Sequence, residues 1–296
     1  MLFKNTVLKF DYQDFILFFT FLLFWVSIQF GQIIEDSIAY SIVLSIGIIH
    51  GSNDFTILKK QNKGNSVFFK SAIFYLLLMF LCVVSYLINA FISILFFIFL
   101  SSYHFGEQHL ESKLSGSKFI KTIFYIFYGM LIFSLIFIEN LNQVAQIMLT
   151  LTGSIIPEIW IKSMLVISSS VLVLCLLYEL LTTIKSKINI ARELFYLLIL
   201  YLVFKTSSLI LGFSIYFVLW HSVPSILDQI KFLSGQHNTK TILSYCKTAF
   251  IYWFISIIGI GIVYYFFSEN LFNSIIFLVL FAVTTPHVWV MHGMKD

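Results

Sequence analysis

Residues 90–108 read AFISILFFIFLSSYHFGEQ, an apolar run with the length of one membrane-spanning helix that carries a histidine, His104, toward its end. Soluble domains have about a quarter of their residues charged, whereas only 11% of these 296 residues are charged and 59% are hydrophobic. Three prolines and 13 glycines are too few for a disordered or fibrous chain. The sequence therefore predicts a polytopic membrane protein. Its net charge of +4 is better explained by loop lysines than by a surface for nucleic acid.

Ten apolar segments of this kind follow one another along the chain. They cover residues 15–34, 38–58, 67–88, 90–108, 119–138, 163–184, 190–205, 209–231, 246–267 and 272–292. A further stretch, 142–156, is apolar but too short to span a bilayer, and we expect it at the membrane interface. We predict an all-α bundle of about ten transmembrane helices, within a range of eight to ten, that forms a single integral-membrane domain over residues 1–296.

The basic residues are distributed unevenly over the loops between these segments. With a cytoplasmic N-terminus, 16 of the 18 Lys and Arg residues fall on the cytoplasmic side, and only Lys162 and Lys205 fall on the other. The opposite loops carry acidic residues instead, among them Glu35, Asp36 and Glu139. This is the positive-inside pattern, and it predicts an even number of spans in the cell (inner) membrane with both termini in the cytoplasm.

Four histidines lie at matching depth in four segments that run in the same direction. His50, His104, His221 and His287 lie about 12 to 15 residues from the outer start of their segments, so their depths agree within about one helical turn. An imidazole in hydrocarbon is costly unless it is paired, and converging neutral imidazoles are good ligands for Fe, Zn or Cu. We therefore predict a metal site at these residues, which requires their helices to be neighbours. For any one of them alone, a structural hydrogen bond between helices stays open.

Other polar side chains accompany this histidine layer. Asp54 follows His50 by four residues, and we predict that it accepts a hydrogen bond from a ligating histidine, with a helix-end cap as the alternative. Further candidates for such a supporting role are Glu107, His109 and His292. For Glu107, a position nearer the membrane surface favours solvation instead.

Large aromatic residues cluster in sequence around the same layer. They are Tyr103, Tyr216, Phe217, Trp220 and Trp289. Together they are candidates for the walls of an apolar tunnel, entered from lipid, that accepts a long conjugated or acyl chain. For each of them, packing against lipid or a neighbouring helix is the alternative.

Four sequence blocks resemble those of one family. HGSND at 50–54, YHFGEQ at 103–108, LWHSVPS at 219–225 and PHVWV at 286–290 resemble, in this order, the signature blocks of the Brp/Blh family. Its members are bacterial and archaeal membrane β-carotene 15,15′-dioxygenases. The resemblance implies a non-haem Fe(II) enzyme that uses O2 to cleave the central double bond of β-carotene. The two retinal molecules formed would be passed to a microbial rhodopsin.

The resemblance also implies roles for the histidines. His50, His104 and His221 match histidines proposed as iron ligands in the family, and His287 matches its PH block. The family often has a second histidine four residues after the WH histidine, where this chain has Ser225. Because of its depth, we expect His287 to be the fourth ligand, with His109 and His292 in reserve.

Two other classes of function stay open on the sequence. A lipid desaturase or hydroxylase would also hold metal within a membrane, but it needs more histidines in paired HxxH or HxxxH clusters, usually for two metals. The second class is not enzymatic. It comprises a metal transporter that uses the histidine layer as a pathway and a carotenoid-binding relative that has lost catalysis, which Ser225 keeps open.

Overall fold

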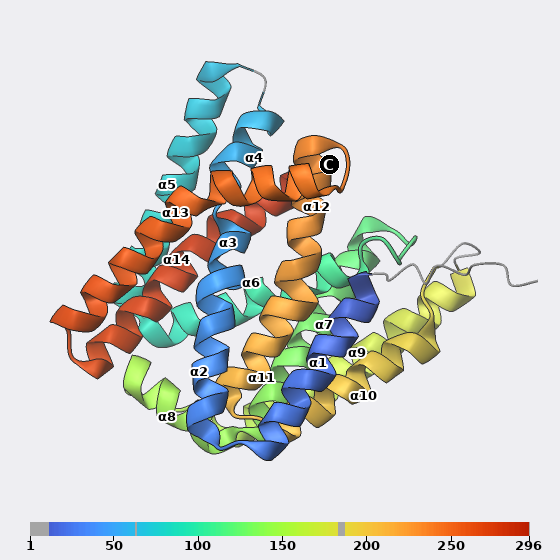
Figure 1. The fold of residues 1–296 in the computed structure, drawn as a ribbon. Helices are drawn as coiled ribbons and strands as arrows, with labels where there is room; N and C mark the ends of the chain where they lie inside the picture. Colours follow the sequence, from blue (N-terminus) through green and yellow to red (C-terminus); the bar gives the residue numbers. More distant parts are fainter. Residues whose placement is uncertain (1–11, 63, 183–186, 296) are drawn as a thin grey trace, which may run out of the picture.

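The computed structural model describes residues 12–62, 64–182 and 187–295, and within them every regular element is a helix (Figure 1). Two long helices are built from several pieces. The first joins α2 (Gln32–Ile42), the π-helical segment η1 (Val43–Gly47), α3 (Ile48–Gly51) and α4 (Asp54–Gln61). The second joins α11 (Leu209–Ile215), the π-helical segment η2 (Tyr216–Ser222) and α12 (Val223–Ser234). The others are α1 (Tyr12–Gln29), α5 (Asn65–Ile88), α6 (Ala90–Leu110), α7 (Lys118–Glu139), α8 (Leu141–Thr152), α9 (Glu158–Thr182), α10 (Ile190–Thr206), α13 (Thr239–Phe266) and α14 (Glu269–Lys295).

The lengths of these helices confirm a polytopic membrane bundle. In the described part of the chain, nine helices are long and apolar enough to cross a membrane, which lies within the predicted range. The predicted segment 190–205 corresponds to α10, which has 17 residues and is not among the nine. The stretch expected to be too short to span corresponds to α8, which has 12 residues.

Contacts at its two termini show that α10 runs from one end of the bundle to the other. Arg192, near its start, lines a cavity together with Tyr12 and Met294, which lie near the start of α1 and the end of α14. Directly after the other terminus of α10, the backbone N–H of Ser208 donates to Glu35 at 2.6 Å, near the start of α2. The first described helix therefore begins, and the last one ends, at the same end of the bundle.

Two glycines allow α6 and α7 to make the most extensive helix–helix contact of the bundle. A methyl group on Gly106 would lie 2.0 Å from the carbonyl oxygen of Tyr125, and one on Gly129 would lie 2.1 Å from that of Ser102. The two backbones touch because neither glycine has a side chain, as is common where helices pack inside membranes. This contact sets the position of His104, which lies on α6 between Ser102 and Gly106.

The helices differ in how deeply they lie within the bundle. Helices α5, α9 and α13 have few buried side chains, whereas α6, α7 and the α11–α12 helix have a much larger share of theirs buried. The segments η1 and η2 contact each other, and η2 also contacts α6. Pro224 follows η2 and has no N–H to give to the preceding turn, while the N–H of Val223 bonds the carbonyl of Val218, five residues back. Such π-helical turns inside α-helices are frequent at functional sites.

Candidate metal centre

Four histidines from four helices meet inside the bundle. His50 lies on α3, His104 on α6, His221 on η2 and His287 on α14, and each is between 1% and 4% exposed. Their ring centroids are 4.5 Å apart for His50–His287, 4.6 Å for His104–His221, 4.9 Å for His50–His221, 5.3 Å for His104–His287 and 6.4 Å for His50–His104. We call this group the four-histidine cluster. The helices that carry it are neighbours, as the predicted metal site required.

Three of these residues present nitrogen atoms at a spacing that suits a metal ion. His50, His104 and His287 each offer one ring nitrogen, and these atoms all lie within 4.8 Å of one another. The Nε2 atoms of His50 and His287 are 2.9 Å apart. A buried donor set made of imidazoles alone fits a transition metal such as iron, copper or zinc rather than Mg²⁺ or Ca²⁺, which take oxygen ligands.

A carboxylate orients the ring of His287. Asp54 Oδ1 accepts a hydrogen bond from His287 Nδ1 at 2.8 Å, and Oδ2 accepts one from the hydroxyl of Tyr75 at 2.9 Å. Because Nδ1 donates to the carboxylate, Nε2 keeps its lone pair and faces His50. Asp54 therefore contacts a histidine of the cluster. This histidine is His287 on α14 rather than His50, which precedes Asp54 by four residues. Nothing in the sequence around Tyr75 distinguishes it from the other aromatic residues of α5.

Gln229 holds His50 from another side. Its Nε2 atom lies 3.1 Å from the carbonyl oxygen of His50 and 3.4 Å from Nδ1, and its Oε1 atom accepts from the hydroxyl of Tyr245 at 2.7 Å. Gln229 is fully buried, although it lies near the end of α12 between Asp228 and Lys231, which are both exposed. Ser225, at the position where the family often has histidine, is also fully buried, 3.3 Å from Gln229 Nε2.

The other candidates for a supporting role have partners of their own. Glu107 is 2% exposed, so the solvation favoured for it is wrong, because α7 and α14 cover this part of α6. It accepts hydrogen bonds from His292 Nδ1 at 2.8 Å and from the Tyr103 hydroxyl at 2.7 Å. His109 pairs with Glu193 at 2.7 Å. A role for Glu107, His109 or His292 around the metal stays a prediction.

The five aromatic candidates for a tunnel point in several directions. Phe217 stacks on His221 with ring centroids 5.9 Å apart, and a methyl group on Gly47 would lie 3.0 Å from its ring. Trp220 donates to Thr20 on α1, and Trp289 is 37% exposed, with its ring 5.0 Å from that of Phe74 on α5. Tyr216 packs on Phe105, and Tyr103 bonds Glu107. The structure thus brings Phe217 to the cluster, and a tunnel lined by all five stays a prediction.

A comparison with protein-family models finds a match over most of the chain. The model described as Beta-carotene 15,15'-dioxygenase matches residues 41–295, a range that contains the whole four-histidine cluster. No curated protein and no solved structure matches this chain.

Proposed function

The chain belongs to the β-carotene 15,15′-dioxygenase family, and on this premise we propose that its four-histidine cluster holds Fe(II). Membership implies an enzyme that cleaves the central double bond of β-carotene with O2 to give two molecules of retinal. The observation that carries the proposal is the buried group of His50, His104 and His287, whose ligand nitrogens lie within 4.8 Å of one another. We propose His221, whose ring centroid lies 4.6 Å from that of His104, as the remaining ligand.

We propose His287 as the fourth ligand, in place of the histidine that the family often has at the position of Ser225. A serine hydroxyl at this buried position contacts Gln229 and has no imidazole nitrogen to offer. His287 has an Nε2 atom 2.9 Å from His50 Nε2, and Asp54 holds its ring by the opposite nitrogen. A carboxylate in this position also raises the basicity of the imidazole toward a metal.

The protein's own part in the reaction is to orient the histidine side chains and to exclude water from the cluster. Bound iron would supply the redox chemistry that activates O2. The side chains of Asp54 and Gln229 orient His287 and His50, and the rings of Phe105 and Phe217 cover His221 at 4.6 and 5.9 Å. Because one O2 and one broken carbon–carbon double bond give two aldehydes, no proton is taken up or released. The overall reaction therefore involves no net proton transfer to or from the protein.

Expression in cells that accumulate β-carotene tests the activity. We expect loss of colour and the appearance of retinal, whereas unchanged carotenoid in the presence of folded protein would refute the assignment. His221→Ala should abolish cleavage and lower the iron content of the purified protein. Retention of stoichiometric iron would exclude His221 as a ligand.

A pair of variants tests the fourth ligand. His287→Ala should lose iron, whereas Ser225→Ala, which removes only a hydroxyl, should retain it. The opposite pattern would move the fourth ligand to the serine position and would contradict our assignment. Measuring iron per chain keeps this test independent of cleavage activity.

We further propose that both termini lie in the cytoplasm and that the retinal passes to a microbial rhodopsin. The basic loops support this orientation, and so does the even number of passes that results when α10 is counted as a tenth crossing. Green fluorescent protein fused to the C-terminus should fluoresce, because it folds in the cytoplasm but not after export. Co-expression with a retinal-free microbial opsin should generate the coloured pigment only when this chain is present.

A further inference from the structure

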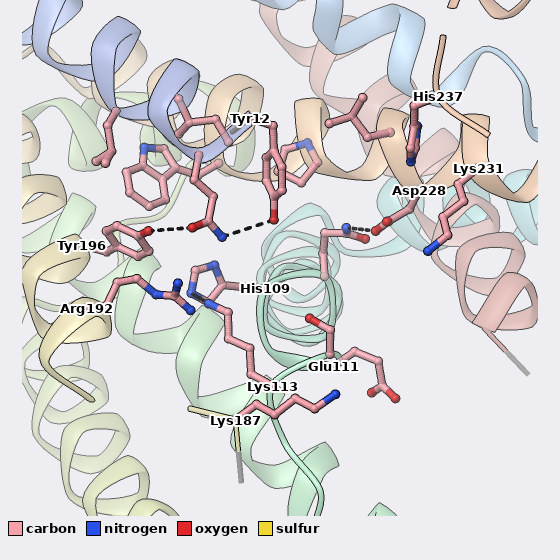
Figure 2. A pocket seen from close by; sticks show the side chains of 18 of the residues that line it. Tyr12, His109, Glu111, Lys113, Lys187, Arg192, Tyr196, Asp228, Lys231 and His237 are labelled. Atoms are coloured by element: carbon pink, nitrogen blue, oxygen red, sulfur yellow. Dashed lines mark hydrogen bonds between the residues drawn. The ribbon is translucent and has the colours of Figure 1, made fainter. Parts of the chain in front are cut away.

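A second site lies at one end of the bundle, away from the four-histidine cluster. A cavity of about 1100 Å³ is lined there by the starts of α1 and α10 and by the ends of α6 and α12 (Figure 2). None of the four cluster histidines is among its lining residues. Because helix ends of a membrane bundle lie at the level of the lipid headgroups, a ligand here would meet both water and the membrane edge.

The cavity presents cations that the protein itself does not neutralise. Lys113 is paired with Glu193 at 2.7 Å, but in the described part of the chain no hydrogen bond or ion pair joins the side chains of Lys187, Arg192 or Lys231 to another residue. The Nε atom of Arg192 is buried without a hydrogen-bond partner. Figure 2 shows Arg192 beside Lys113, with Lys231 across the cavity.

The two acidic residues of the lining have other partners. Asp228 accepts from Gln108 at 2.7 Å, and Glu111 accepts from Tyr125 and from Lys121. They therefore do not saturate the cations. An anion would add the missing charge, and a phosphate offers several oxygen acceptors to guanidinium and ammonium groups at once.

The rest of the lining is apolar. It includes Ile16, Leu17, Trp220, Leu227 and Phe232. A small inorganic anion would gain nothing from such walls, whereas an amphiphile with an anionic head would use both parts of the cavity. Basic pockets between transmembrane helices are known to take phospholipid headgroups.

We propose that this cavity binds the phosphate headgroup of an anionic phospholipid, with Arg192 as the direct contact of the phosphate, Lys231 adding electrostatic attraction from across the cavity, and the apolar wall along the upper acyl chain. The site would anchor the starts of α1 and α10 to the ends of α6 and α12. It is separate from the metal, so its function does not depend on the proposed ligand set.

Native mass spectrometry of the purified full chain tests the proposal, with phosphatidylglycerol and phosphatidylcholine of identical acyl chains added in turn. We expect tighter binding of phosphatidylglycerol. Arg192→Gln and Lys231→Gln should each weaken it about fivefold, and the double variant about 25-fold. The matched control is Lys240→Gln, an exposed lysine at the start of α13 that does not line the cavity, and it should bind as the unaltered chain does.

Equal binding of the two lipids, or an equal loss in Lys240→Gln, would overturn the proposal. Inorganic phosphate forms the second arm. If it binds at the same concentrations and displaces phosphatidylglycerol, the cavity is a site for free phosphate and the lipid assignment fails. Circular dichroism and iron content show whether each variant is folded. If the double variant does not fold, the two single variants carry the test.

Discussion

Replacing Gly129 by alanine tests how closely α6 and α7 must pack to place His104. The added Cβ would lie 2.1 Å from the carbonyl oxygen of Ser102 and 2.4 Å from its Cα. Both are backbone atoms and cannot rotate away. Ordinary van der Waals contact begins at 3.4 Å, so the oxygen contact alone falls about 1.3 Å short, and α6 must move outward by about this amount.

This displacement should lower both the stability of the fold and the rate of cleavage. Overpacking a well-packed interior costs about 1–3 kcal/mol, and we expect the upper end because no side chain can give way. His104 lies two residues after Ser102 on the same helix and would move with it. A shift of about 1 Å at a reacting centre can lower a rate about 100-fold, so cleavage should fall by that order and the iron content should fall with it.

Thermal unfolding, iron per chain and retinal formation measure the effect on purified protein. The control is Gly259→Ala on α13, where an added Cβ would meet nothing within 4 Å. The same chemical change there should leave all three measurements unchanged or stabilise the helix by up to about 1 kcal/mol. If Gly129→Ala has the melting temperature and the iron content of the control, close contact of α6 and α7 does not position His104, and the reasoning is wrong.

Three other predictions concern the surroundings of the site and the fold. Tyr75→Phe removes the hydrogen bond to Asp54 and should weaken iron binding about 10-fold or more, measured by iron retention against a chelator; unchanged retention would show that Asp54 needs no second partner. Glu35→Ala leaves the buried N–H of Ser208 without its acceptor and should destabilise the protein by about 1–3 kcal/mol, while Glu35→Gln, which keeps an acceptor oxygen, should cost less in the same melting experiment. Removing the metal with a chelator should lower the melting temperature, because a ligand at 100 times its Kd stabilises the folded state by about 2.7 kcal/mol; an identical melting curve would argue against a metal bound in the folded bundle.

Much of the architecture could be predicted from one-dimensional patterns. The apolar run at 90–108 became α6 (Ala90–Leu110), because a stretch of this length and composition can satisfy its backbone in lipid only as a helix. The depth of a histidine along the membrane normal also depends only on its place in such a run. His50, His104, His221 and His287 could therefore be placed in one layer before any contact was known.

The depth of each histidine does not predict which side chains contact one another within that layer. Sequence proximity joined Asp54 to His50, but the carboxylate bonds His287, 233 residues away in the chain, and Tyr75 on a third helix. A position nearer the membrane surface favours solvation of Glu107, yet its side chain is buried beneath neighbouring helices.

The sequence by itself determined the membrane bundle, its helices and the depth of its histidines, because hydrophobicity and helical rise act along each segment independently. Only the tertiary structure decided which residues meet across that depth. The lateral arrangement depends on close contacts such as that between Gly129 and Ser102, and on the π-helical turns of η1 and η2, which change the face that His50 and His221 present. Both are properties of helix pairs and of local geometry, and no single segment carries them in its own pattern of residues.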